Sequence, residues 1–461
     1  MKKVCKIKFA AASLGAAGIL VTLLNALHVI GLTQTWITLL TLASVSMLLV
    51  TEALPLALSA MLAPVCLALN GVLSVKEAFS GFSNENVVLF AAMFVVGGAM
   101  FRTGVAAMIG EAVVKRAEGD PGKLVLYVML SVALLSSVMS NTGTVAVLLP
   151  VCVSIADSAH MDRKCLLMPL AMMASLGGMI TLVGTPPNIN VAAVLQEYGY
   201  ESFGFLEFAY IGIPLSLMGG AYLFWVYGRR LGAKAGKGTP SAAHSGAGVA
   251  EEAEAVSAGR GRMTRGQRLS LAILAGVVAV MATGILNLTL GAVIGALLCV
   301  LLGLVTEKEV IEDIDWTTIF LFAGMLPLAD AMEKTGAGEM IAGWAVQIIG
   351  ENPSDVAVLT ILFVVCAGLT QFMSNTAACA LLAPIGIEIA IALNANPKAV
   401  LMMIGIASSC AFATPMAMPP NTLVMGQAKA GFMDFVKLGV PLIAVSYVGC
   451  ILIIPRVWPF F

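Results

Sequence analysis

Two copies of a short polar motif lie inside long apolar stretches of this sequence. The motif MSNT occurs at residues 139–142, within SSVMSNTGTVAVLLP, and again at residues 373–376. Ser, Asn and Thr carry hydrogen-bonding groups, and burying such groups in an apolar setting is costly unless something satisfies them. The chemistry of these residues therefore depends on the partners that the fold provides.

A second pair of motifs interrupts the helical pattern. The segments GTPPN at 184–188 and AMPPN at 417–421 each hold two consecutive prolines, which lack an amide donor and break a helix. The carbonyls freed in this way, together with Ser, Thr and Asn oxygens, suit a small dehydrated cation, while the N-terminal ends of broken helices favour an anion. None of the four motif regions contains Asp, Glu, Lys, Arg or His, which favours sodium over proton coupling.

Each motif also has a purely structural interpretation. Ser, Asn and Thr in membrane helices commonly bond to neighbouring helices or back to their own carbonyls, and prolines commonly only kink a helix. The repetition weakens this interpretation, because Ser136 and Thr370 are both hydroxyl residues four positions before a Ser-Asn-Thr triplet. We therefore interpret the four regions as parts of one binding site.

Composition places the chain in a membrane. Of its 461 residues 59% are hydrophobic and 11% are charged, and the mean hydropathy is +0.98. A typical soluble protein has roughly a quarter of charged residues. Apolar runs reach the ~20 residues that a spanning helix needs, so we predict an all-α polytopic membrane protein. The nine cysteines and three histidines form no metal or disulfide pattern, so we expect no cofactor, and we expect no nucleic acid partner.

Hydropathy predicts about eleven transmembrane helices. They lie near 9–31, 36–53, 54–72, 87–111, 166–200, 205–228, 267–286, 288–305, 316–335, 398–428 and 434–457. Two further apolar stretches, 124–158 and 355–394, are too long for one span, and each holds a Ser-Asn-Thr triplet in its middle. We predict that both are re-entrant hairpins, whose irregular backbone is covered by protein or lines a cavity.

The distribution of basic residues gives an orientation. With a cytoplasmic N-terminus, 21 of the 25 lysines and arginines fall on the inside, including those of the polar segment 229–268. An excess of basic residues on the cytoplasmic side is the usual pattern of membrane proteins. We therefore predict that 229–268 is a flexible cytoplasmic linker and that the C-terminus is periplasmic or extracellular.

The chain contains an internal repeat. The segment 75–93 aligns with 307–325, so that Leu89 matches Leu321, and the MSNT and PPN motifs recur in the same order. The predicted organisation is an N-terminal span outside the repeat at 1–35, a first half at 36–228, the linker, and a second half at 269–461. Each half holds an odd number of spans, which predicts an inverted repeat, an architecture common among secondary transporters.

At these motifs the sequence resembles the divalent anion/sodium symporter family. The residues that match the signature of this family are Ser409, Phe412, Pro415, Met416, Ala417, Asn421, Leu423 and Val424. The resemblance covers nearly the whole chain outside the linker. It implies eleven spans with two opposed hairpins, a homodimer, and alternating access of the elevator type.

The resemblance also implies roles for individual residues. The implied sodium ligands are Ser136, Ser140, Asn141 and Gly184 in the first half, and Thr370, Met373, Asn375, Ala417 and Pro419 in the second. The implied substrate contacts are Ser140, Asn141, Thr142, Thr185, Ser374, Asn375, Thr376 and Met418. The implied helix-break residues are Pro186, Pro187, Asn188, Pro420 and Asn421. Met418 departs from the family, in which this position is often Thr, so a hydroxyl is replaced by a thioether.

The function expected from the sequence is sodium-coupled import of a small dianion across a bacterial inner membrane. Within the family that the sequence resembles, two intact Ser-Asn-Thr triplets look like the C4-dicarboxylate branch, so the resemblance implies a substrate such as succinate, malate or fumarate. The alternatives are a sodium-independent dicarboxylate exchanger, a sulfate or citrate carrier, and an intramembrane anion sensor or channel. No enzymatic activity is expected.

Overall fold

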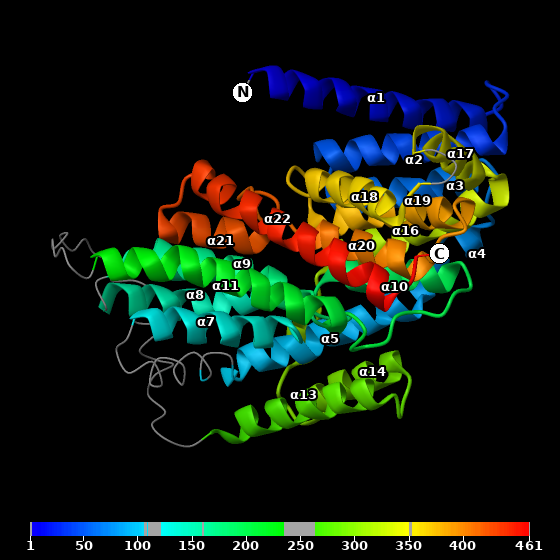
Figure 1. Cartoon of the computed structure of the whole chain (residues 1–461). Helices are drawn as coiled ribbons and strands as arrows, with labels where there is room; N and C mark the ends of the chain where they lie inside the picture. The colour runs from blue at the N-terminus through cyan, green and yellow to red at the C-terminus, as the bar shows by residue number, and fades with distance from the viewer. Residues whose placement is uncertain are drawn as a thin grey trace.

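The computed structural model of the chain describes residues 2–105, 108, 121–158, 161–234, 263–349 and 353–460. Over these residues it contains twenty α-helices, one short 3-10 helix and no strand (Figure 1). The predicted all-α class is therefore confirmed. Most of the predicted linker, residues 235–262, lies outside the described part of the chain.

The first half and the span before it form ten of the α-helices. They are α1 (Lys2–Ala26), α2 (Gln34–Thr51), α3 (Leu56–Leu69), α4 (Val75–Ala78), α5 (Glu85–Arg102), α7 (Pro121–Ser136), α8 (Asn141–Ser158), α9 (Lys164–Gly178), α10 (Pro186–Glu197) and α11 (Ala209–Lys234), with the 3-10 helix at Ser80–Ser83. Short polar residues mark where several of them begin. For example, the Ser74 side chain accepts from the amide of Glu77 and the Glu77 side chain bonds back, which caps α4.

The second half forms the other ten. They are α13 (Arg265–Thr283), α14 (Leu288–Leu301), α15 (Glu307–Asp313), α16 (Trp316–Thr335), α17 (Ala337–Ile349), α18 (Asp355–Leu369), α19 (Asn375–Ala392), α20 (Pro397–Ser409), α21 (Pro419–Ala428) and α22 (Phe432–Val457). The same kind of capping box starts α15, where Thr306 and Glu309 bond reciprocally. The short helices α4 and α15 thus occupy matching places in the two halves.

Six of the described helices are long and apolar enough to cross a membrane, or seven if the bent pair α15–α16 is one span. Several shorter apolar helices accompany them, because polar breaks divide stretches that hydropathy alone joins. The predicted spans 166–200 and 398–428 are each two helices, α9 with α10 and α20 with α21. The number of eleven spans stays a prediction.

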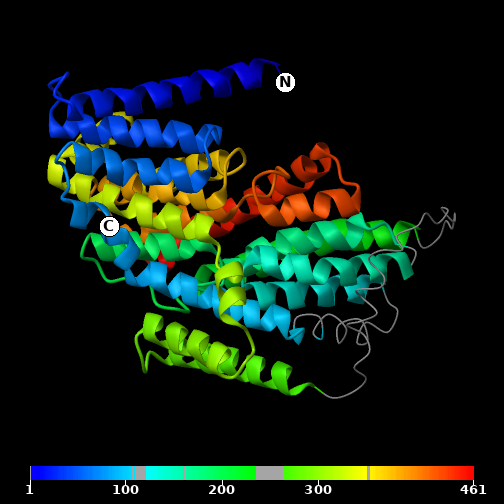
Figure 2. The same cartoon turned by 180° about the vertical axis from the view of Figure 1, so that it is seen from behind.

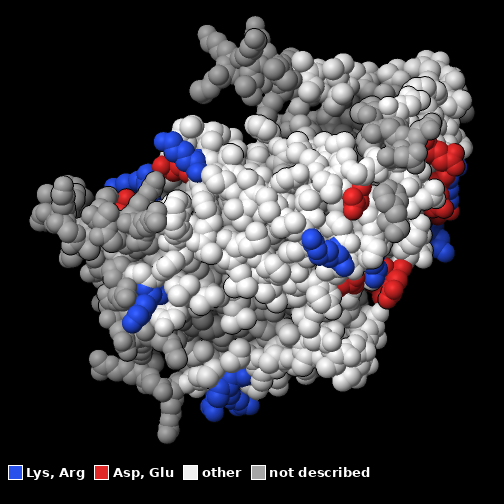
Figure 3. All heavy atoms as spheres, in the orientation of Figure 1, with Lys and Arg blue, Asp and Glu red and all other residues white. Residues whose placement is uncertain are grey.

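The outer surface agrees with a membrane setting. In the face drawn in Figure 3, charged side chains lie mostly toward the two ends of the helices, and a broad uncharged area lies between them. Leu290, Leu297 and Leu301 of α14 are 57%, 56% and 78% exposed. Large apolar side chains exposed along one helix are expected where lipid replaces water.

Contacts between the two halves come in reciprocal pairs. Helix α5 packs against α14, and its counterpart α16 packs against α3, the counterpart of α14. In the same way α8 packs against α21 while α19 packs against α10. Reciprocity of this kind is what a two-fold rotation between equivalent units produces.

One set of contacts departs from this symmetry. Helix α10 packs against α19 and α20, as its counterpart α21 packs against α8 and α9, but α10 also packs against α5 and α16, and α21 has no comparably extensive contact with α16 or α5 in the described structure. Asn86 of α5 donates to the side chain of Gln196 of α10 at 2.8 Å. Figures 1 and 2 show α10 beside α5 and α16, and α21 toward the other end of the molecule. The two halves therefore share local structure but differ in how these two helices are placed.

Candidate functional site

The first Ser-Asn-Thr triplet lies at a break between two helices. Helix α7 ends at Ser136 and α8 begins at Asn141, so the two residues face each other across the break. The Ser136 hydroxyl donates to the carbonyl of Ala174 in α9 at 2.7 Å. The side chains of Ser136 and Asn141 are buried, with exposed fractions of 0% and 5%. The break is therefore fastened to α9 from within the protein.

Oxygen atoms converge on the amide of Asn141. The amide atom that faces inward lies 2.6 Å from Ser136 Oγ, 3.0 Å from the Ala174 carbonyl oxygen and 3.3 Å from the Gly184 carbonyl oxygen. If the amide nitrogen faces this cluster, it donates to these oxygens. If the amide oxygen faces it, the cluster holds more lone pairs than protons, because Ser136 has one hydroxyl proton. Such a set of neutral oxygens is suited to a small cation.

The second half repeats only part of this arrangement. Thr370, the C-cap of α18, donates to the carbonyl of Ser408 at 2.7 Å. This bond spans 38 residues, as does the bond from Ser136 to Ala174. Asn375, however, accepts from the backbone N–H and the hydroxyl of Thr376, at 2.9 and 3.3 Å. The hydroxyl-to-carbonyl bond is thus common to both halves, and the amide is placed differently.

The prolines of both PPN motifs begin helices rather than interrupt them. Pro186 and Pro419 are the first residues of α10 and α21, and the irregular breaks 179–185 and 410–418 precede them. Proline is well placed there because the first amides of a helix have no intrahelical acceptor. The N-caps Thr185 and Met418 have nearly the same backbone, with φ/ψ of −145°/144° and −144°/143°. Neither uses its side chain as a cap, so methionine replaces threonine without the loss of a capping bond.

Only some of the predicted substrate residues around the triplets make side-chain hydrogen bonds in the described structure. Ser140 accepts from the amide of Gly143 at 3.2 Å, and Ser374 is the N-cap of α19 without a side-chain capping bond. Thr142 is half-buried and Thr376 is buried. No hydrogen bond among the described residues joins 140–142 to 374–376. The meeting of the two triplets therefore stays a prediction.

The predicted corner residues Thr185 and Met418 are both buried, at 1% and 3% exposure. The Thr185 hydroxyl has no hydrogen-bond partner within the described structure. The Met418 sulfur accepts from the hydroxyl of Ser175 in α9 at 3.2 Å. The Met418 thioether, in the second half, thus accepts a hydrogen bond from Ser175 of the first half.

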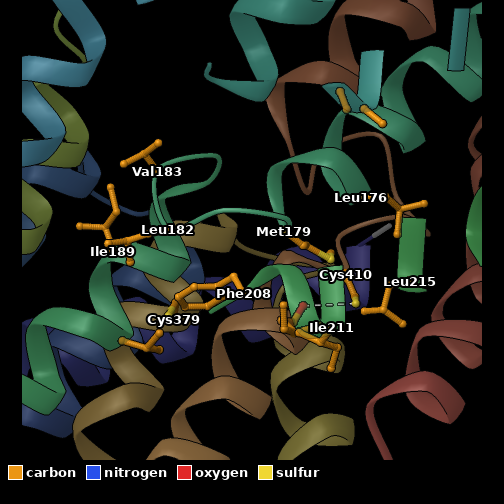
Figure 4. Packing of buried hydrophobic residues seen from close by; sticks show 14 of the residues in the cluster. Leu176, Met179, Leu182, Val183, Ile189, Phe208, Ile211, Leu215, Cys379 and Cys410 are labelled. Carbon is orange, nitrogen blue, oxygen red and sulfur yellow. Dashed lines mark hydrogen bonds between the residues drawn. The ribbon is translucent and has the colours of Figure 1, made fainter. Parts of the chain in front are cut away.

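Apolar side chains of neighbouring helices pack against the break at 179–185. Figure 4 shows Met179, Leu182 and Val183 among side chains of α11 and of the second half. Gly212 of α11 lies against the Met179 carbonyl, and an added Cβ would be 2.3 Å from that oxygen. Gly439 of α22 has the same relation to the Phe412 carbonyl, also at 2.3 Å. The glycines allow α11 and α22 to approach the breaks closely.

The sequence and the fold can be compared with known proteins at this point. Residues 46–388 and 339–460 match the citrate transporter family. The chain belongs to this family. It is a transport protein and not an enzyme, and the membrane assignment made from composition is confirmed.

Relatives of this citrate transporter family member carry the names of transporters. An uncharacterized transporter of Haemophilus influenzae is 29% identical over 86% of this chain and 86% of its own length. The uncharacterized transporter YfbS of Escherichia coli is 26% identical over 86% and 94%. The sodium-dependent dicarboxylate transporter SdcS of Staphylococcus saprophyticus is 25% identical over 88% and 82%. The resemblance proposed from the motifs is therefore confirmed.

Solved structures share the fold of the chain. The YdaH transporter of Alcanivorax borkumensis superposes with a TM-score of 0.60 at 16% identity, covering 82% of this chain and 86% of that one. MtrF of Neisseria gonorrhoeae superposes with a TM-score of 0.58 at 17% identity, covering 85% and 83%. At such low identity the likeness supports the architecture alone.

Several residues of the site in this citrate transporter family member were not predicted. The carbonyls of Ala174 and Ser408 carry no sequence signal, because every residue has a carbonyl. Thr181 and Thr414 did carry a sequence signal, because both are threonine and they are separated by the same number of residues as the two PPN motifs. Their hydroxyls donate to the carbonyls of Ser137 and Gln371, respectively, which ties each break to the neighbouring triplet.

The second break has an additional support. The Gln371 side chain donates to the carbonyls of Ala367 and Cys410 at 2.7 and 2.9 Å. Its oxygen accepts from the amide of Ala413 at 2.9 Å. The matching residue of the first half is Ser137, whose short side chain bonds only locally, to the Leu134 carbonyl at 2.7 Å. The second break is therefore held by more side-chain bonds than the first.

Proposed function

We propose that this protein imports a small dianion, most readily a C4-dicarboxylate, together with sodium ions. The observation that carries the proposal is the cluster formed by Ser136, the Asn141 amide and the carbonyls of Ala174 and Gly184. These groups come from four separate segments and are uncharged, and with the Asn141 amide oxygen turned toward the cluster they would supply only neutral oxygen ligands. A dehydrated sodium ion is stabilised by several such oxygens without any change of protonation.

A second sodium site would involve Thr370, Met373, Asn375, Ala417 and Pro419. In the described structure Thr370 makes the same bond to a carbonyl as Ser136 does. The Asn375 amide oxygen would leave Thr376 and turn toward Thr370 when an ion binds. This proposal therefore includes a side-chain rearrangement in the second half that the first half does not need.

The dianion would bind between the two triplets. Helices α8 and α19 begin at Asn141 and Asn375, and the positive ends of their dipoles favour carboxylates there. The hydroxyls of Ser140, Thr142 and Ser374 would add hydrogen bonds. Dicarboxylate transport by SdcS proteins, at about 25% identity, supports this substrate class.

The proposed transport cycle uses the repeat. The pairs α7–α8 and α18–α19 would be re-entrant hairpins that enter from opposite sides of a bacterial inner membrane. The N-terminus would be cytoplasmic and the C-terminus periplasmic. The site would move across the membrane as one unit, in an elevator-type cycle, within a homodimer.

Uptake into proteoliposomes tests the proposal. Radiolabelled succinate should accumulate when an inward sodium gradient is imposed, with malate and fumarate as competitors. Potassium and choline gradients of the same strength are the controls. An equal rate in all three salts would point to a sodium-independent exchanger. Competition by sulfate or citrate alone would change the substrate class, and flux without saturation or counterflow would indicate a channel.

A further inference from the structure

The asparagine of the first PPN motif closes the break that precedes it. Asn188, in the first turn of α10, is 0% exposed. Its amide nitrogen donates to the carbonyl of Thr181 at 2.8 Å and to that of Gly178 at 3.3 Å. Gly178 ends α9 and Thr181 lies within the break. One side chain thus joins the end of one helix to the beginning of the next.

The second PPN motif repeats this arrangement bond for bond. Asn421 is also 0% exposed, and its nitrogen donates to the carbonyls of Ala411 and Thr414 at 2.9 and 3.0 Å. In both halves the bonds span 10 and 7 residues. The carbonyls after a helix end lack intrahelical partners, and one amide satisfies two of them. The two breaks therefore have the same internal bracing.

The bracing leads directly to the proposed ion ligands. A Cβ added to Gly178 would lie against the inward-facing amide atom of Asn141 and 3.0 Å from the Gly184 carbonyl oxygen. The residue that Asn188 holds is therefore in contact with the oxygen cluster. In the second half Ala411, which Asn421 holds, packs in one buried group with Ala417 and Met418.

Both asparagines carry an energetic cost. The amide oxygens of Asn188 and Asn421 are buried and have no hydrogen-bond partner in the described part of the chain. A buried acceptor without a donor costs free energy, so these side chains are not optimal for stability alone. The benefit that we assign to them is the fixed shape of the breaks.

We propose that Asn188 and Asn421 are positioning residues that hold the breaks so that the carbonyls of Gly184 and Ala417 face the coupling ions. This inference rests on the proposed sodium symport. The residues act through the backbone and do not touch the ion or the substrate. Loss of either amide should therefore weaken the apparent affinity for sodium more than it slows the transport cycle.

The test compares Asn188→Ala, Asn188→Ser, Asn421→Ala and Asn421→Ser with wild type in proteoliposomes. The loss of both hydrogen bonds should raise the half-saturating sodium concentration roughly tenfold or more. The maximal rate, corrected for the amount of inserted protein, should change by less than about threefold. The serine variants keep a small polar group and guard against failure of the alanine variants to fold.

Asn190→Ala is the matched control. Asn190 lies on α10 two residues after Asn188 and is buried, and its side chain accepts from the Cys379 thiol at 3.7 Å rather than from the break. Its half-saturating sodium concentration should stay at the wild-type value. An unchanged sodium dependence in the Asn188 and Asn421 variants, with only the maximal rate or the protein yield reduced, would overturn the proposal.

Hydrogen–deuterium exchange separates this proposal from the proposed function. In the Asn188 variants, exchange should increase in residues 179–185 and not in 410–418, and the reverse should hold for Asn421. Unchanged exchange in both breaks would refute the bracing even if uptake is impaired. If wild-type uptake ignores sodium, the symport fails and the ion-positioning role fails with it, while the exchange data still report whether the asparagines hold the breaks.

Discussion

Arg102 and Lys334 occupy corresponding positions at the ends of α5 and α16, and each forms an ion pair with the opposite half. Arg102 bonds to Glu309 of α15 at 2.9 Å, and Lys334 bonds to Glu77 of α4 at 2.6 Å. Glu77 and Glu309 are themselves matching residues of the repeat. The exchange of partners is the side-chain counterpart of the reciprocal helix contacts, and it links each basic helix end to a short helix of the other half.

The two ion pairs should differ in strength. Lys334 and Glu77 are 47% and 43% exposed, and solvent screens an exposed pair so that it contributes little to stability. Lys334→Ala should therefore lower the thermal midpoint by less than Arg102→Ala. Arg102 also bonds to Asp313 through two nitrogens, at 3.0 and 2.8 Å. Thermal unfolding in detergent measures the difference. Equal midpoints for the two variants would contradict it.

The Lys334–Glu77 pair should not respond to pH near neutrality. The hydrogen bond from Lys334, with those from Ser74, lowers the pKa of Glu77 to about 2. A lowered carboxyl pKa gives a contribution that is present above the ordinary value and is lost only as pH falls through about 2. Between pH 5 and 9 the thermal midpoint of Glu77→Gln should therefore differ from wild type by a constant amount. A difference that grows across this range would refute the assignment.

Removal of either triplet asparagine should abolish uptake. Asn141→Ala removes the amide at the centre of the oxygen cluster, and Asn375→Ala removes the matching amide of the second half. Each substitution should reduce sodium-driven uptake at least roughly tenfold. The protein should still insert and elute as a folded species. Ser137→Ala is the control, because the Ser137 hydroxyl bonds locally to the Leu134 carbonyl. Wild-type uptake in both asparagine variants would return the triplets to a packing role.

Met418 should influence which dianion is carried. Its sulfur accepts from the Ser175 hydroxyl, which also bonds to the Ala171 carbonyl at 3.3 Å. Met418→Thr would remove the sulfur contact and add a second hydroxyl at the same corner. We expect the order of inhibition by succinate, malate, fumarate, citrate and sulfate to change. Met418→Leu keeps the volume and should preserve the order. An identical competition profile for Met418→Thr and wild type would remove Met418 from the site.

The unequal placement of α10 and α21 predicts a contact of the other transport state. Asn86 donates to Gln196 here, and the matching residues of the repeat are Thr318 and Lys429. If the two halves exchange conformations in the other transport state, α21 would pack against α16 as α10 packs against α5 here. This would bring Thr318 and Lys429 together. In a background without native cysteines, the pairs 86/196 and 318/429 should each cross-link, and each cross-link should block uptake. Failure of the 318/429 pair to cross-link under any sodium or substrate condition would contradict the exchange.

Hydropathy, proline and short polar residues act locally, so the helical class, the repeat and the four motif regions could be predicted from the amino-acid sequence. Which carbonyls complete the oxygen cluster could not be predicted in this way. Ala174 and Ser408 have no distinguishing side chain, and their role depends on the packing of α9 and α20 against the triplets.

The role of the PPN asparagines and the difference between the halves likewise depend on long-range packing. Asn188 reaches back 10 residues to Gly178 only because the break folds onto the end of α9. Matching motifs in the two halves encode the same local bonds, so local sequence does not specify whether α10 or α21 packs against α5 and α16. That choice depends on long-range packing between the halves.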